Sequence, residues 1–206
     1  VVSEIMIGLE ADAVLAHGRS YADDRPVVVY GSSIVHGVSA SRCGLIYTNL
    51  LARHLDRPVT NLGFAGAALG EETMMRYLAG LDMSVFVYDY DHNARSVESL
   101  NNTHKRGYEI IREAHPHVPI LMITRPNAST NPREATERKA VIWNSYCSAC
   151  AAGDRNVYYI DGESFFRGKY EYECTTDCVH PNDIGYMLMA EGIEAEVRKA
   201  LSRCEI

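Results

Sequence analysis

Short apolar runs alternate with longer amphipathic segments along the chain from residue 26 onward. The runs are rich in β-branched and aromatic residues and end at glycine, proline or polar positions, a pattern typical of buried strands. Five strands are predicted on this basis, at 26–30, 58–62, 84–90, 119–124 and 156–160.

The segments between the runs repeat their apolar residues with helical spacing. Tyr47, Leu50, Leu51 and Leu55 share one helix face, and a second helix is expected from Val97 to Ile111. Another helix should open after Asn131, with Pro132 at its first position. The last helix should follow Asn182 as its cap, with five residues on its buried face: Tyr186, Ala190, Ile193, Val197 and Ala200.

Strands that alternate with helices predict one α/β domain, with a mostly parallel sheet covered by helices on both faces. Residues 1–25 lack a clear pattern and are interpreted as a lead-in strand or arm, which leaves 26–206 for the domain. At 206 residues the chain is long enough for one well-packed core and short for two.

Composition and charge narrow the classes of partner. The net charge of −7 gives no attraction to a phosphate backbone, so nucleic acid is not expected as a partner. No apolar run approaches the ~20 residues of a membrane span, and no basic-then-apolar leader is present. The chain opens on Val1, so we expect a piece of a longer product, and its location, secreted, periplasmic or cytoplasmic, stays open.

Four polar loops follow the predicted strands or precede the last helix. They are Gly31–Gly37, Asn61–Gly66, Asp89–Asn93 and Asp177–Asn182. The carboxyl ends of parallel strands meet at one edge of a sheet, where ligands bind in open α/β folds. These loops are therefore expected to meet at one site.

The residue types in these loops are those of a serine hydrolase. A serine hydroxyl becomes a nucleophile when a base takes its proton, which suits Ser33 with His180. Asp177, three residues before His180, can hold the other imidazole nitrogen and fix its tautomer. Acyl transfer also needs hydrogen-bond donors for an oxyanion, and three are available: the Ser33 N–H, the Gly66 N–H and the Asn93 side-chain amide.

With these residues the chain resembles the SGNH hydrolases, also called GDSL esterases, from about residue 26 to 200. The resemblance implies a three-layer α/β/α sandwich with a flavodoxin-like, five-stranded parallel sheet. It also implies Ser33, Asp177 and His180 as the triad and Ser33, Gly66 and Asn93 as the oxyanion hole. It is similar to a bacterial branch in which an N-terminal β-sandwich often precedes the domain.

Two motifs differ from the family pattern. The usual Gly-Asp-Ser-Leu reads Gly-Ser-Ser-Ile here, so Ser32 replaces the acid, and the usual Gly-x-Asn-Asp reads Asp-His-Asn-Ala at 91–94. These loops line the pocket of the family, so the changes bear on the choice of substrate. His36, Asp91 and Arg125 are candidate substrate contacts.

Other side chains allow different hypotheses. Asp89, Asp91 and His92 could bind a metal at a strand end, since alternation along an extended segment would point both carboxylates the same way. Cys147 and Cys150 could bind zinc, or could face the core together with Ala140 and Trp143. Cys174 and Cys178 could form a disulfide or take part in a zinc site.

The favoured reaction is hydrolysis of a carboxylic ester through an acyl-serine, with no metal or organic cofactor. The resemblance favours a short acyl group, such as acetyl on a carbohydrate or another small molecule. Three alternatives stay open: acyl transfer to an alcohol by the same triad, a non-catalytic flavodoxin-like binding domain, and a metal-dependent phosphoesterase.

Overall fold

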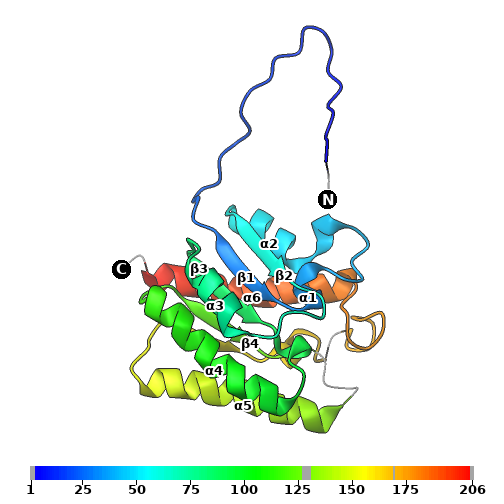
Figure 1. Ribbon diagram of the computed structural model, residues 1–206. Coiled ribbons are helices and arrows are strands. Elements are labelled where there is room, and N and C mark those ends of the chain that lie inside the picture. The colour runs from blue at the N-terminus through cyan, green and yellow to red at the C-terminus, as the bar shows by residue number, and fades with distance from the viewer. Residues whose placement is uncertain (1–2, 127–130, 169, 205–206) are drawn as a thin grey trace.

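A computed structural model of the protein describes residues 3–126, 131–168 and 170–204. A parallel five-stranded sheet lies at its centre, with the strand order β2-β1-β3-β4-β5 (Figure 1). The strands are β1 (Val27–Gly31), β2 (Val59–Gly63), β3 (Val85–Asp89), β4 (Ile120–Ile123) and β5 (Val157–Ile160). Each lies within one of the five segments predicted from sequence or extends it by one residue.

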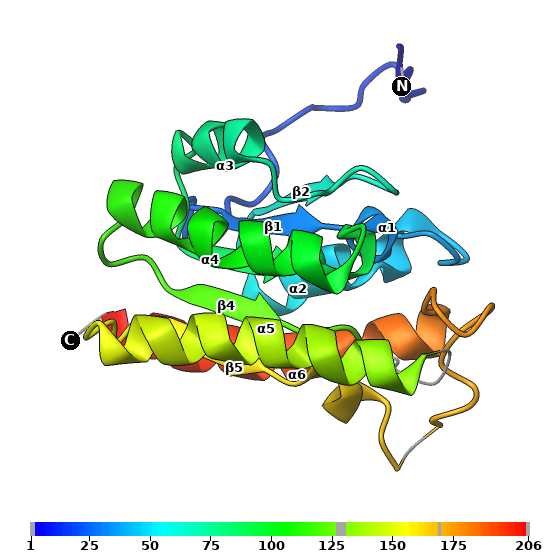
Figure 2. The same cartoon turned by 60° about the horizontal axis from the view of Figure 1, so that its bottom comes forward.

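Helices cover both faces of this sheet, as Figure 2 shows from a second direction. They are α1 (Ser33–His36), α2 (Tyr47–Leu55), α3 (Glu72–Ala79), α4 (Val97–Ala114), α5 (Pro132–Ala151) and α6 (Asp183–Cys204). Three short 3₁₀ turns complete the described structure, at η1 (Cys43–Leu45), η2 (Asp91–Asn93) and η3 (Gly162–Phe165). The three-layer α/β/α sandwich expected from the sequence is the observed fold.

The sheet separates two apolar cores. Val27 and Val29 of β1 pack with α1, α2 and α6, whereas Val28 and Tyr30 of the same strand pack with α3, α4 and α5. This division follows from strand geometry, because successive side chains point to opposite faces. The three interior strands, β1, β3 and β4, are buried along their whole length.

Side-chain caps set the helix starts that the sequence predicted. Asn131 accepts a hydrogen bond from Glu134 N–H, and Pro132 is the first residue of α5. Asn182 accepts from the N–H groups of Ile184 and Gly185 at the start of α6. The predicted inner face of α6 is confirmed, since its five residues have no exposed surface.

Two features of the helices differ from expectation. Trp143 is 47% exposed and Cys147 is also exposed, so the predicted inward face of α5 is wrong. The buried face is instead made by Ala135, Arg138, Ile142, Ser145 and Ala149. Because two of these residues are polar, a search for apolar residues at helical spacing does not find this face. Helix α3 was not predicted, because Met75 and Leu78 are its only fully buried residues.

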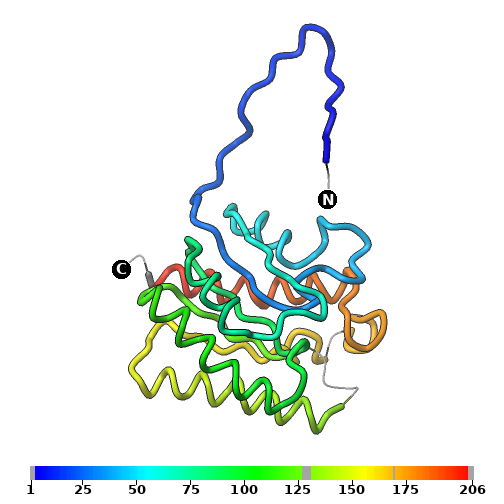
Figure 3. The backbone as a smooth tube through the Cα atoms, in the orientation of Figure 1, coloured from blue at the N-terminus to red at the C-terminus, as the bar shows by residue number. Residues whose placement is uncertain are grey.

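The first described residues, 3–25, form neither helix nor strand and stand away from the domain as an arm (Figure 3). Apolar side chains are exposed along it, including Ile5, Met6 and Val14. The arm meets the domain near the end of α2, where Arg19 pairs with Asp56 and Arg57 pairs with Asp23. The division at residue 25/26 stays a prediction.

Within the described part of the chain, no helix has both the length and the apolar character needed to cross a membrane.

Candidate active site

Ser33 follows β1 by two residues, at the carboxyl edge of the sheet. Ser32 is the cap residue of the short helix α1, and its Oγ accepts a hydrogen bond from Ile34 N–H at 3.2 Å. Ser33 is the first residue of this helix, so its own N–H has no carbonyl partner within the helix. The acid of the family motif is thus replaced by a serine that serves as a helix cap.

Three side chains from distant parts of the chain form a continuous hydrogen-bonded row. The Ser33 Oγ lies 2.9 Å from His180 Nε2, and His180 Nδ1 lies 2.6 Å from Asp177 Oδ2. The His180 side chain is 23% exposed and that of Asp177 is 51% exposed. In Figure 1 the orange segment before α6 lies beside α1, in agreement with the contact between Ser33 and His180.

A tight turn connects Asp177 to His180. The Asp177 Oδ1 accepts hydrogen bonds from Val179 N–H at 3.0 Å and His180 N–H at 2.7 Å. Together with the bond to the imidazole, these hydrogen bonds lower the pKa of Asp177 to about 2. Cys178 has a φ of 65°, an unusual backbone conformation for a non-glycine residue, which lets the turn close within four residues.

Asn93 lies in η2, opposite the loop that follows β2. With its oxygen toward that loop, the Asn93 amide accepts from Gly66 N–H at 2.6 Å and Ala67 N–H at 3.0 Å. In the opposite orientation, Asn93 Nδ2 lies 3.3 Å from the Phe64 carbonyl oxygen. The two predicted oxyanion donors, Gly66 and Asn93, therefore contact each other, and the loop supplies two donors for the Asn93 amide oxygen.

The sequence matches the GDSL-like lipase/acylhydrolase family over residues 24–198. The chain belongs to this family. It is thereby a member of the superfamily of GDSL-type esterases and acyltransferases. A comparison with curated proteins found no match.

Solved structures share the fold. A protein from Bacteroides ovatus described as a GDSL-like lipase is 28% identical, with a TM-score of 0.83 over 94% of this chain and 58% of its own. A salicylyl-acyltransferase from a tetracycline biosynthetic pathway is 22% identical, with a TM-score of 0.78 over 93% and 58%. A family two carbohydrate esterase from Clostridium thermocellum is 18% identical, with a TM-score of 0.72 over 91% and 67%. The chain therefore spans 58% of the length of the first two structures.

The candidate substrate contacts of this GDSL-family chain differ in exposure. His36 is exposed near the rim, where its Nδ1 lies 3.2 Å from the Gly63 carbonyl oxygen. Asp91 is 1% exposed and is bound by Arg125, whose Nη2 lies 2.9 Å from Asp91 Oδ1. Asp91 therefore has no open surface for a substrate, whereas the side chain of its partner Arg125 is 13% exposed.

The structure does not support a metal site at Asp89, Asp91 and His92. Asp89 contacts Tyr47 of α2, whereas Asp91 contacts Arg138 of α5, on the other face of the sheet. Alternation ends here because β3 stops at Asp89 and η2 begins at Asp91. Among the described side chains, no group of three or more His, Cys, Asp or Glu is arranged to hold a metal ion.

Burial shifts the pKa values of Asp89 and His92 toward their uncharged forms. Burial raises the pKa of Asp89 to about 8, although the Tyr47 hydroxyl donates to its Oδ2 at 2.9 Å. Burial lowers the pKa of His92 to about 4, and its Nε2 has no hydrogen-bond partner in the described part of the chain. In both groups burial therefore favours the uncharged form.

The cysteine hypotheses are not supported by the described residues. Cys147 and Cys150 are unlinked and belong to no metal-binding group. The Cys174 thiol is buried, donates to the Tyr170 carbonyl at 2.8 Å and is not bonded to Cys178.

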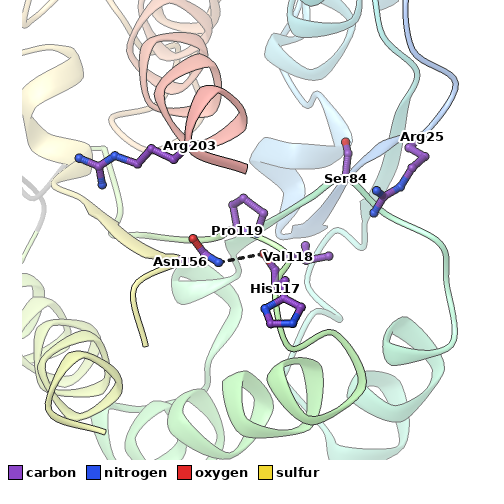
Figure 4. A pocket seen from close by; sticks show the side chains of 7 residues that line it. All are labelled: Arg25, Ser84, His117, Val118, Pro119, Asn156 and Arg203. Carbon is purple, nitrogen blue, oxygen red and sulfur yellow. Dashed lines mark hydrogen bonds between the residues drawn. The ribbon is translucent and has the colours of Figure 1, made fainter. Parts of the chain in front are cut away.

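Two hollows lie at opposite ends of the strands. One, of about 310 Å³, is beside the Asp177–His180 turn and is lined by Ser39, Ser41, Asn182, Asp183 and Ile184. The other, of about 380 Å³, is at the amino ends of the strands, and neither of these two hollows is lined by Ser33, Asp177 or His180. Its lining is drawn in Figure 4: Arg25, Ser84, His117, Val118, Pro119, Asn156 and Arg203.

One residue near the site carried no signal in the sequence. Arg138 is one of several charged residues early in α5, yet it is 3% exposed and its guanidinium reaches the segment that bears Asn93. Only the tertiary structure distinguishes it from its exposed neighbours.

Proposed function

We propose that this GDSL-family chain is a serine esterase with Ser33 as its nucleophile, His180 as its general base and Asp177 as the acid that orients His180. One observation carries the proposal: the row from Ser33 Oγ to His180 Nε2 and from His180 Nδ1 to Asp177, with spacings of 2.9 and 2.6 Å. These are hydrogen-bond distances, as proton transfer requires.

The reaction follows from this row. Ser33 Oγ attacks the ester carbonyl carbon while His180 Nε2 takes the hydroxyl proton, which gives a tetrahedral oxyanion. The oxyanion collapses, the C–O bond to the alcohol breaks, and His180 returns the proton to the leaving alcohol. Water then attacks the acyl-serine with the same histidine as base, which releases the acid and restores Ser33. Asp177 stays ionised and stabilises the imidazolium in both halves.

The oxyanion requires a change at Asn93. We propose that the incoming carbonyl oxygen replaces the amide oxygen of Asn93 as the acceptor for Gly66 N–H. The Asn93 amide then turns over and presents Nδ2 as a second donor beside the Ser33 N–H. Three donors would surround the oxyanion, a site that removes on the order of 3 kcal/mol per donor from the barrier.

For the substrate we propose a short-chain ester of a carbohydrate or a similar polyhydroxy alcohol. The hollow next to the Asp177–His180 turn supports this, because Ser39, Ser41 and Asp183 line it, together with the exposed Ile184. Polar groups of this kind bind sugar hydroxyls, and an apolar side chain can cover a sugar face. The fold-level likeness to carbohydrate esterases is consistent with the same class.

Labelling tests the nucleophile. A fluorophosphonate should modify the protein at one serine, and mass spectrometry of the digested protein should place the adduct on Ser33. Ser33→Ala should abolish labelling and lower the turnover of acetylated sugars or nitrophenyl acetate by at least about 10³-fold while the fold is kept. A folded Ser33→Ala variant with full activity would contradict the proposal.

Acyl transfer to an alcohol is the second candidate, because the same triad serves it and an acyltransferase shares the fold. The two reactions are separated by product analysis with an added acceptor alcohol. Acyl transfer faster than hydrolysis at millimolar acceptor would favour the transferase.

A further inference from the structure

Arg138 is a buried cation next to the candidate oxyanion segment. Its side chain is 4% exposed, although arginine is rarely buried unless it is paired. It comes from the buried face of α5, a helix that supplies none of the three triad residues. A buried guanidinium must be paired, so the groups that Arg138 contacts indicate its role.

The guanidinium of Arg138 donates to both ends of the segment that carries Asn93. Nη1 lies 2.8 Å from the Asp91 carbonyl oxygen, and Nη2 lies 2.9 Å from the Ala94 carbonyl oxygen. The third nitrogen, Nε, lies 2.6 Å from Glu134 Oε1 one turn earlier in α5. One planar group thus brackets residues 91–94 and is itself held in orientation from its own helix.

A second contact fixes the same segment from the loop after β4. Both the backbone N–H and the guanidinium of Arg125 donate to the Asp91 carboxylate, at 3.0 and 2.9 Å. Burial raises the pKa of Asp91, but the charge and hydrogen bonds of Arg125 lower it by more. The pKa of Asp91 therefore lies below its usual value. The segment is therefore tied to the core through backbone carbonyls and through one ionised side chain.

We infer that Arg138 is a positioning residue for Asn93. The inference rests on the proposed function, because it assumes that Asn93 donates to the oxyanion. A 3₁₀ turn of three residues has little internal stability, so external donors set where the Asn93 amide lies. A donor displaced by a fraction of an ångström loses transition-state stabilisation while substrate binding is hardly changed.

A matched control exists at the other end of the strands. Arg112 donates to the carbonyl oxygens of His115, Val118 and Asn156 and pairs with Asp154, so it is also a multiply bonded arginine. It is far from the triad along the strands, because Val118 and Asn156 precede β4 and β5. Replacing it tests for general destabilisation alone.

The experiment is a double-mutant cycle. Arg138→Lys keeps the charge but cannot bond both carbonyls, so kcat should fall about 10–100-fold with KM changed less than about 2-fold. Arg112→Lys should lower the melting temperature with kcat unchanged. In an Asn93→Ala background, Arg138→Lys should lower kcat by no more than about 3-fold, because its effect passes through Asn93.

Equal loss of kcat in both backgrounds, or no loss in either, would overturn the inference. If Arg138→Lys does not fold, Glu134→Gln replaces it in the cycle, with a smaller loss that should again disappear in Asn93→Ala. Failure of the proposed function looks different, since the unaltered protein would then not be labelled at Ser33.

Discussion

The Asp177 carboxylate holds His180 twice, once through the backbone N–H at 2.7 Å and once through the imidazole Nδ1 at 2.6 Å. The hydrogen bond to the backbone N–H stabilises the turn, and the hydrogen bond to Nδ1 orients the imidazole for the proposed reaction. Asp177 Oδ1 makes the backbone contact and Oδ2 makes the imidazole contact, so a substitution can remove one role and keep the other.

Asp177→Asn should separate them. The amide oxygen can still accept from the Val179 and His180 N–H groups, so the turn and the melting temperature should be kept. The amide nitrogen would face Nδ1, which favours the wrong imidazole tautomer and removes the negative charge. We expect kcat to fall about 10²–10⁴-fold, measured with an ester substrate at saturating concentration. An unchanged kcat in a folded variant would show that Asp177 is only a turn residue.

Asn93→Asp distinguishes acceptance from donation at the proposed oxyanion hole. A carboxylate can accept from Gly66 and Ala67 as the native amide does, but it cannot donate and it repels an oxyanion. The variant should be folded and should lose at least about 10²-fold in kcat, as Asn93→Ala also should. Should Asn93→Asp retain most of its turnover, Asn93 would serve the loop and not the reaction.

Asp89 should make stability depend on pH. Burial raises its pKa in the folded protein from 3.8 to about 8, so between these values the folded state holds a proton that the unfolded chain has lost. The stabilisation is complete below about 4 and is lost as the pH rises toward 8, by up to about 1.4 kcal/mol per pH unit. Urea unfolding should show this decline in the unaltered protein relative to Asp89→Asn. Parallel stability curves for the two proteins would contradict it.

Gly31→Ala should be strongly destabilising. A Cβ at this position would lie 2.0 Å from the Asp89 carbonyl oxygen, a backbone atom of the neighbouring central strand. We expect a loss of about 3 kcal/mol or more in the free energy of unfolding. Gly44→Ala is the control, since its Cβ would be no closer than 3.9 Å to the atoms around it and should change the free energy by less than about 0.5 kcal/mol.

The parts of the fold that sequence predicted are those with strong local signals. Strands buried on both faces read as apolar runs, and Asn131 with Pro132 marks the start of α5. The inner face of α5 could not be read this way, because Arg138 is buried by its contacts with distant carbonyls and not by apolarity. For the site, the four loops could be expected at one edge of the sheet. The pairing of Asp91 with Arg125 could not, because it depends on where β3 ends and η2 turns.

The short turn from Asp177 to His180 has a consequence for how tolerant the site is to change. His180, the proposed base, and Asp177, the acid that orients it, lie in one four-residue turn. Small shifts of the surrounding structure therefore move the two residues as a unit and keep their alignment. Within the triad, the one spacing that tertiary packing has to maintain is the distance between this turn and the Ser33 hydroxyl. A destabilising substitution elsewhere in the domain should therefore lengthen the distance from Ser33 Oγ to His180 Nε2 before it separates His180 from Asp177.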